Sequence, residues 1–193
     1  MRIGVFGGTF DPPHMGHLIP VEAAREVLGL DQIRIVPAAV SPHKLDREGS
    51  PGDMRLAIVR LAFGGNSAFV IDERELRRKP PSFMVDTLEE LHKELTVDSL
   101  FLILGMDNLA EFETWKNPER ILDLATVVAL ARPNARPGPE ETLLTRRIQR
   151  LETPLVEIAS SSVRERVRMG RSIRYLVPDP IRDYIERNRL YGQ

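Results

Sequence analysis

Residues 2–17 read RIGVFGGTFDPPHMGH, and this stretch decides the fold. It opens with an apolar run at 2–6 that stops at Gly7 and Gly8, as a buried strand does when it enters a tight turn. Beyond the turn, apolar residues recur at spacings of three and four until Gly29, which predicts an amphipathic helix. The stretch therefore reads as a strand, a turn and a helix.

The same alternation continues along the chain. Further strands are predicted at 33–37, 68–71, 100–104 and 126–131, with helices at 53–63 (Asp53 as its cap) and 85–95. After a polar segment at 134–141, which we expect to be mobile, the pattern predicts a helix at 143–151, a strand at 155–158, and helices at 163–169 and 181–188. Strands that alternate with helices indicate an α/β fold, a parallel sheet with helices on both faces.

Composition limits the function classes. The chain has 193 residues, 42% hydrophobic and 28% charged, which suits one globular domain, and its net charge of -1 calls for no nucleic acid or membrane partner. The absence of cysteine excludes a disulfide framework, a thiol nucleophile and a cysteine zinc site. With no signal peptide core and no apolar run of membrane-spanning length, we expect a cytoplasmic protein.

The turn after the first strand is the predicted ligand site, because open parallel sheets bind ligands beyond the carboxyl ends of their strands. Gly7 and Gly8 allow close backbone approach, and Gly16 leaves further room. His14 and His17 are three positions apart, so both imidazoles lie on one side of the helix start, where amide groups favour negative charge. This array suits the phosphates of ATP.

Two other interpretations of the histidine pair stay open. A His-x-x-His pair can bind a metal, but a zinc site needs three or four protein ligands, and only His43 and His92 remain elsewhere. The two histidines can also be ordinary surface residues. The combination of a glycine pair, an Asp-Pro turn and paired histidines at one junction favours the phosphate site, and no protein-bound metal is predicted.

Residues 7–17 resemble the signature of the nucleotidyltransferase superfamily that shares its paired-histidine motif with class I aminoacyl-tRNA synthetases, in the form typical of nicotinate mononucleotide adenylyltransferases. Similar matches extend over nearly the whole chain. They comprise Pro42-His43-Lys44, the segment 81–88, Gly105-Met106-Asp107, Trp115, Arg132-Pro133 and the segment 158–164.

The resemblance implies a Rossmann-like, doubly wound sheet and a single nucleotidyltransferase domain over 1–193. Residues 1–158 would form the core, and a small helical portion at 159–193 would complete the ATP site. The implied reaction transfers the adenylyl group of ATP to nicotinate mononucleotide, giving deamido-NAD and pyrophosphate, with Mg²⁺ arriving on ATP. ATP and nicotinate mononucleotide are thus the expected partners, and the oligomeric state stays open.

The resemblance also implies roles for individual residues. The catalytic group is His14, His17, Lys44 and Arg164. The ATP-binding residues are Gly7, Gly8, Thr9, Phe10, Gly16, Gly105, Asp107, Ser160 and Ser161. The residues that bind the mononucleotide are Lys44, Ser82, Phe83, Met84, Asp86, Trp115 and Arg132.

The chemistry of these residue types supports the roles but leaves alternatives. Lys44 can act as a mobile charge on phosphate or be one more solvent lysine, and Asp107 can bind a ribose hydroxyl or cap the following helix. Ser160 and Ser161, with Arg164 one turn on, can hold a phosphate or form a plain helix cap. Trp115 is implied to stack on the pyridine ring, although by itself it reads as core.

Departures from the family pattern concern the base more than the phosphates. Phe83 and Met84 stand where the family commonly has Tyr and Thr, so backbone N–H groups are left to read the nicotinate carboxylate. Ala159 replaces a serine, and Val40-Ser41 precedes Pro42 where a second proline is usual. The alternatives are an adenylyltransferase acting on nicotinamide mononucleotide or phosphopantetheine, a cytidylyltransferase, and a nucleotide-sensing module without turnover. A transfer-RNA synthetase fits less well, since the chain is short.

Overall fold

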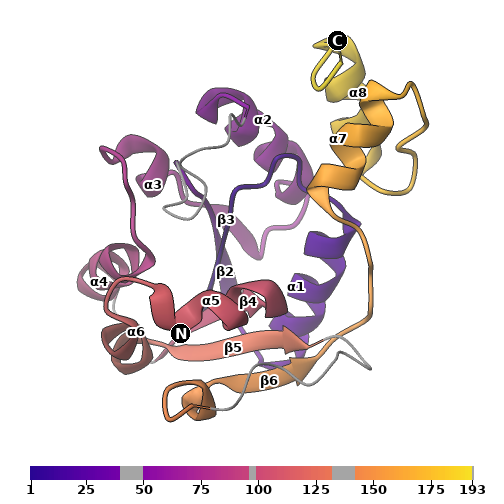
Figure 1. Ribbon diagram of the computed structural model, residues 1–193. Helices are drawn as coiled ribbons and strands as arrows, with labels where there is room; N and C mark the ends of the chain where they lie inside the picture. Colours follow the sequence, from indigo (N-terminus) through magenta and orange to yellow (C-terminus); the bar gives the residue numbers. More distant parts are fainter. Residues whose placement is uncertain (40–49, 96–98, 132–141, 193) are drawn as a thin grey trace.

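Six parallel strands form the centre of the protein in the order β3-β2-β1-β4-β5-β6 (Figure 1). The computed structural model describes residues 1–39, 50–95, 99–131 and 142–192. The strands are β1 (Arg2–Gly8), β2 (Gln32–Pro37), β3 (Phe69–Ile71), β4 (Ser99–Gly105), β5 (Thr126–Ala131) and β6 (Gln149–Glu152). The order reverses between β1 and β4, so the predicted doubly wound α/β sheet is confirmed. In sheets of this kind, the reversal is where a ligand-binding crevice is expected.

Helices cover both faces of this sheet (Figure 1). One face carries α1 (Met15–Val27) and α2 (Gly52–Phe63); the other carries α4 (Met84–Glu94), α5 (Met106–Glu111), the 3₁₀ turn η2 (Phe112–Thr114) and α6 (Pro118–Leu124). Ile3 and Val5 of β1 pack toward α4, whereas Phe6 packs toward α1. Strand periodicity thus builds a separate apolar core on each face.

The last two helices form a third core with α2. These helices, α7 (Ser160–Arg168) and α8 (Asp179–Arg187), contribute Val163 and Ile181, which are fully buried with Ile58 of α2. Figure 1 shows the chain running from β6 past α1 to this pair of helices at the far side of the sheet. The carboxyl-terminal part of the chain therefore lies beside the turn between β1 and α1, where Leu176 contacts Met15.

Two predicted elements near the carboxyl end are wrong. The structure has a 3₁₀ turn, η3 (Thr145–Arg147), and β6 where a helix was predicted at 143–151, and 155–158 forms no strand. The apolar spacing fits a helix, but Leu143 is 82% exposed, so a helix there would bury little. Pairing with β5 instead satisfies the backbone groups along the edge of that strand and buries Ile148.

Smaller differences concern helix ends. The cap of α2 is Pro51, and the predicted cap, Asp53, lies in the first turn, where its charge still suits the helix dipole. The short helices α3 (Arg74–Arg77), α5 and α6 were not predicted as elements. The predicted mobile segment at 134–141 lies outside the described residues. Among the described helices, none is long and apolar enough to cross a membrane.

Candidate active site

The turn after β1 is shaped by close packing over its two glycines. An added Cβ at Gly8 would lie 3.0 Å from the ring of Phe10, which folds back over the strand end with a φ of 50°. At Gly7 an added Cβ would lie 2.7 Å from the terminal methyl of Met84. The side chains of Phe10 and Met84 thus occupy the space beside these glycines, and a larger residue would require them to shift.

The two histidines meet at the start of α1. His14 is the N-cap residue, and its amide donates a hydrogen bond of 3.2 Å to Nδ1 of His17. The ring centroids of the pair are 3.8 Å apart, and the ring of Phe10 packs edge-on against His17 at 5.3 Å. Because Nδ1 of His17 accepts a hydrogen bond, the neutral ring carries its proton on Nε2. The predicted pairing of the two imidazoles is therefore present.

His14 is a buried polar residue without a hydrogen-bond partner for Nδ1 among the described residues. It is 4% exposed, and burial lowers the pKa of His14 to about 4, so the ring is neutral near pH 7. Buried polar atoms in folded proteins are nearly always paired. The unpaired atom, Nδ1, is itself fully buried, so a ligand beside the reversal of strand order would meet the other side of this imidazole.

The amides at the start of α1 are only partly available for a ligand. Met15 donates its N–H to the carbonyl of Leu176 at 2.9 Å, and the amides of His17 and Leu18 donate to the carbonyl of His14. Within the described ranges, the amide of Gly16 makes no hydrogen bond. The donor array is thus narrower than the sequence predicts: the two imidazoles and the Gly16 amide.

Gly16 is also constrained by its surroundings. An added Cβ would lie 3.0 Å from Nδ1 of His14 and 3.1 Å from the carbonyl oxygen of Val156. Contacts this short would push the imidazole or the backbone away. Gly16 therefore lets the His14 ring lie against the helix start.

The start of α7 lies against the same turn, as the sequence predicts. The hydroxyl of Ser160 donates to the carbonyl of Pro12 at 2.9 Å, and Nη1 of Arg164 donates to the carbonyl of Asp11 at 2.7 Å. Ser161 is exposed in the first turn of α7. These donors hold the backbone of the turn, and Arg164 has further N–H groups on its guanidinium.

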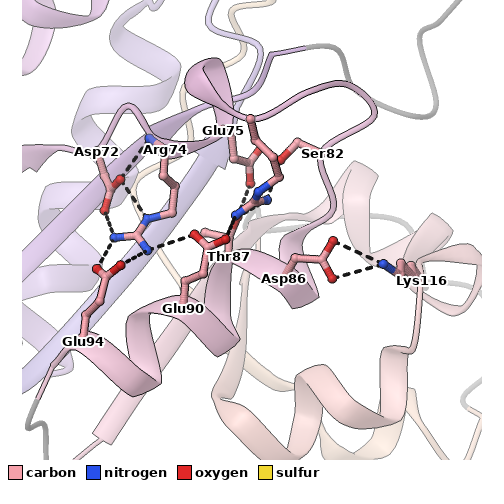
Figure 2. A network of polar contacts seen from close by, with 10 residues as sticks. Asp72, Arg74, Glu75, Ser82, Asp86, Thr87, Glu90, Glu94 and Lys116 are labelled. Carbon is pink, nitrogen blue, oxygen red and sulfur yellow. Dashed lines mark hydrogen bonds and ion pairs between the residues drawn. The ribbon is translucent and has the colours of Figure 1, made fainter.

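Four of the predicted mononucleotide residues, Ser82, Phe83, Met84 and Asp86, lie at the start of α4. Phe83 is its N-cap, and the ammonium of Lys116 lies 4.6 Å from the centre of the Phe83 ring. Lys116 also forms an ion pair of 3.1 Å with Asp86, and Figure 2 shows the two side chains pointing toward each other. Trp115 packs against the apolar core on this face of the sheet, with its ring 5.6 Å from that of Phe112.

Ser82 belongs to a polar network that sequence reasoning missed (Figure 2). Its hydroxyl, which is buried, accepts a hydrogen bond of 2.7 Å from Arg78, which also contacts Thr87 and Glu90. Arg74 beside it binds Asp72, Glu90 and Glu94. The Ser82 side chain thus anchors the segment before α4. In the sequence, the signal for this network was the presence of charged residues at helical spacing.

The remaining predicted residues are only partly described. Gly105 ends β4 and is the N-cap of α5, and an added Cβ there meets no atom of the described residues within 4 Å. Asp107 is the second residue of α5, but its side chain is outside the description. Lys44 and Arg132 lie outside the described residues, so their roles stay predictions.

Three residues at this corner were missed from the sequence: Asp11, Arg55 and Tyr191. Asp11 and Arg55 are buried charged groups, and Tyr191 bonds to Asp11 across 180 positions. For these three residues, the only signal in the sequence was that Asp11 lies inside the motif at 7–17.

No group of three or more His, Cys, Asp or Glu in the described parts of the chain is arranged to hold a metal ion.

Comparison with known proteins agrees with this geometry. Residues 5–166 match the Cytidylyltransferase-like family. A curated protein of Exiguobacterium sibiricum, named probable nicotinate-nucleotide adenylyltransferase, is 40% identical over 192 residues that span 100% of both chains. One of the same name from Thermus thermophilus is 42% identical over 99% of this chain and 100% of its own. The chain belongs to the nicotinate-nucleotide adenylyltransferase family.

Solved structures support the fold of this family. Plasmodium falciparum nicotinic acid mononucleotide adenylyltransferase complexed with NaAD is 16% identical and superposes with a TM-score of 0.78, covering 98% of this chain and 97% of that one. The same enzyme complexed with APC gives a TM-score of 0.75 at 16% identity, covering 98% and 96%. The prediction of a nucleotidyltransferase with a Rossmann-like sheet is confirmed.

Proposed function

We propose that this protein transfers the adenylyl group of ATP to nicotinate mononucleotide, giving deamido-NAD and pyrophosphate. Family membership supports the reaction class. The observation that carries the proposal is the close pair of imidazoles of His14 and His17 at the start of α1, beside the amide of Gly16. Neutral imidazoles and a helix-start amide each have an N–H group, and such donors suit a triphosphate.

The chemistry requires positioning more than proton transfer. A phosphate oxygen of the mononucleotide attacks the α phosphorus of ATP in line, while the bond from that phosphorus to the bridging oxygen breaks and pyrophosphate leaves. The attacking phosphate is already ionised near neutral pH, so no general base is needed. Orientation and stabilisation of charge on the departing oxygens supply the catalysis.

His14 and His17 are the residues that stabilise this charge in our proposal. A neutral His14 donates one N–H, as does His17 from Nε2, and neither needs a net charge to do so. Arg164 and Ser160 hold the turn through one donor each, and Arg164 keeps other N–H groups to direct at phosphate. We assign Lys44 and Ser161 to phosphate contacts as well.

The rest of the nucleotide would occupy the crevice between β1 and β4. We assign the adenosine of ATP to the strand ends, lined by Gly7, Gly8, Thr9, Phe10, Gly105 and Asp107. Residues 159–193 complete this side of the site, in one domain over 1–193, because α7 contacts the turn directly.

The mononucleotide would lie at the start of α4. The amide of Met84, the first residue of α4, belongs to the helix start, where amides lack intrahelical acceptors and suit a carboxylate. Trp115 stacks on the pyridine in this proposal, and Arg132, Phe83, Ser82 and Asp86 shape or anchor the pocket. Because the carboxylate of Asp86 already pairs with Lys116, we assign Asp86 to the lining of the pocket and not to direct contact with the mononucleotide.

Mg²⁺ would enter with ATP, held by phosphate oxygens and water, and would neutralise phosphate charge. A hard cation prefers oxygen ligands, and the described donors around His14 are imidazoles and amides. The carboxylate at this corner, Asp11, already accepts hydrogen bonds from Ser50 and Tyr191. These residues fit a metal that stays on the substrate.

The test is to incubate the protein with ATP, Mg²⁺ and, separately, nicotinate mononucleotide, nicotinamide mononucleotide or phosphopantetheine. Pyrophosphate release is followed, and each product is identified by mass. We expect deamido-NAD, with the highest specificity constant for the nicotinate substrate. Equal constants for the two mononucleotides would contradict the acid preference. Absence of pyrophosphate with all three would favour a nucleotide-binding module instead.

A further inference from the structure

A buried carboxylate connects the carboxyl-terminal tail to the turn that carries the histidine pair. Asp11 is 7% exposed. The hydroxyl of Tyr191 donates to its Oδ1 at 2.7 Å, and the amide of Ser50 donates to its Oδ2 at 3.2 Å. Nη1 of Arg164 donates to the main-chain carbonyl of the same residue. Asp11 thus receives hydrogen bonds from three separate parts of the chain.

Arg55 holds the backbone around this carboxylate. Its guanidinium, on a side chain that is 4% exposed, donates to four carbonyl oxygens at 2.6 to 3.0 Å, those of Thr9, Ala38, Ala39 and Ser50. One of these belongs to the histidine turn, and the others lie on either side of residues 40–49. The backbone at this corner is therefore held by buried charged groups, and one guanidinium connects the histidine turn to the other segments.

Charge balance at Asp11 depends on these donors. Burial raises the pKa of Asp11, but the hydrogen bonds from Ser50 and Tyr191 and the charge of Arg164 outweigh it and hold the pKa below its usual value. Asp11 is therefore ionised at neutral pH. Removing one donor leaves a buried carboxylate with an unsatisfied oxygen, which is costly and favours a rearrangement of the groups around it.

We propose that Tyr191 is a positioning residue for ATP: its hydroxyl, through Asp11, holds the turn that places His14 and His17. This inference rests on the proposed function, in which that turn binds the triphosphate. The ring of Tyr191 packs on the core of α7 and α8, so the hydroxyl alone reaches the turn. Phe83, Met84 and Trp115, which we assign to the mononucleotide, pack on the core of the opposite face of the sheet, whereas Tyr191 packs on the core of α7 and α8.

The test compares Tyr191→Phe with Tyr184→Phe. Tyr184 lies on α8 and packs on the same core, and its hydroxyl makes no hydrogen bond within the described part of the chain, so its removal is a matched loss of one oxygen. Dissociation constants for ATP with Mg²⁺ and for nicotinate mononucleotide are measured by calorimetry, which needs no turnover. Thermal unfolding of all three proteins shows whether each is folded.

We expect Tyr191→Phe to weaken ATP binding about fivefold to tenfold, the size of one ordinary hydrogen bond, because the turn is displaced and not removed. Binding of the mononucleotide should stay within about twofold, and Tyr184→Phe should match the original protein in both. If Tyr191 only stabilised the fold, the folded Tyr191→Phe protein would keep the original dissociation constants for both ATP and the mononucleotide. Unchanged ATP binding, or equal weakening of both ligands, would overturn the inference.

A second variant covers a failure of Tyr191→Phe to fold. Asp11→Asn keeps one oxygen acceptor but removes the charge that Ser50 and Tyr191 share, so it should weaken ATP binding selectively as well. Normal ATP binding by folded Asp11→Asn would also overturn the inference. Because calorimetry is independent of product formation, absence of deamido-NAD synthesis would count against the proposed function alone.

Discussion

The imidazole rings of His14 and His17 lie 3.8 Å apart between centroids, inclined by 39°. Two cationic rings at this separation would repel, so the arrangement requires that one of them be neutral. Burial supplies that condition by lowering the pKa of His14 to about 4. The pair can therefore present two N–H donors side by side near neutral pH, which suits a group whose negative charge is shared among several oxygens.

The depressed pKa of His14 predicts a pH dependence of folding. Its value is about 4 in the folded protein and 6.5 in an exposed histidine, so between these values the unfolded chain binds more protons. Stability should therefore fall as the pH drops from 6.5 to 4, by up to about 3 kcal/mol from this residue. Urea unfolding at several pH values measures the effect.

The matched comparison for this prediction uses two histidine variants. His14→Gln should show a shallower decrease of stability with acid than the original protein, because the titrating group is gone. His92→Gln should keep the original slope, since His92 is exposed on α4. Parallel slopes for the original protein and His14→Gln would argue against a buried neutral imidazole.

Gly16→Ala should impair the site through a single methyl group. The added carbon meets Nδ1 of His14 at 3.0 Å and the carbonyl oxygen of Val156 at 3.1 Å, so the ring or the helix start must shift. We expect a loss of about 1 to 3 kcal/mol in stability and at least about tenfold in turnover. Gly65→Ala is the control, since among the described residues no atom lies within 4 Å of its added carbon. Equal activity of the two variants would be inconsistent with this packing.

Arg55→Lys should destabilise the protein although it keeps the charge. A lysine ammonium lacks the planar fork that reaches four carbonyl oxygens, so buried acceptors lose their donors. We expect a decrease of at least about 2 kcal/mol in the free energy of unfolding. Arg60→Lys, on the same helix but 59% exposed, should change it by less than about 0.5 kcal/mol. Similar values for the two variants would contradict the role of Arg55.

The part of the site that could be predicted from the sequence is local. The run from β1 through Gly7 and Gly8 to the histidines contains its own strand, turn and helix signals within a few residues, so its structure was predicted correctly and its phosphate chemistry could be proposed. The parallel sheet followed from alternating elements, whereas its doubly wound strand order was expected from the family resemblance. In contrast, β6 forms because β5 offers an open edge, and no pattern within residues 143–151 reports that neighbour.

Contacts between distant segments explain the other omissions. Tyr191 and Asp11 are 180 positions apart, and the methyl of Met84 covers Gly7 from another helix. Nothing in the sequence immediately around Tyr191 or Met84 marks these residues as part of the site. Ser82 was predicted as a substrate contact, but its hydroxyl is engaged by Arg78, which became visible only with the fold. Long-range pairing of this kind leaves no periodic signal in a single sequence.

The most direct test of the central idea is the rate of pyrophosphate release from ATP and nicotinate mononucleotide by purified His14→Ala and His17→Ala. The exposed variant His92→Ala serves as the control. Each active-site variant should remain folded and lose at least about a hundredfold in turnover, as when a preorganised donor to developing charge is removed. The control should keep the original rate. Near-normal turnover by folded His14→Ala or His17→Ala would contradict the assignment of these imidazoles to the triphosphate.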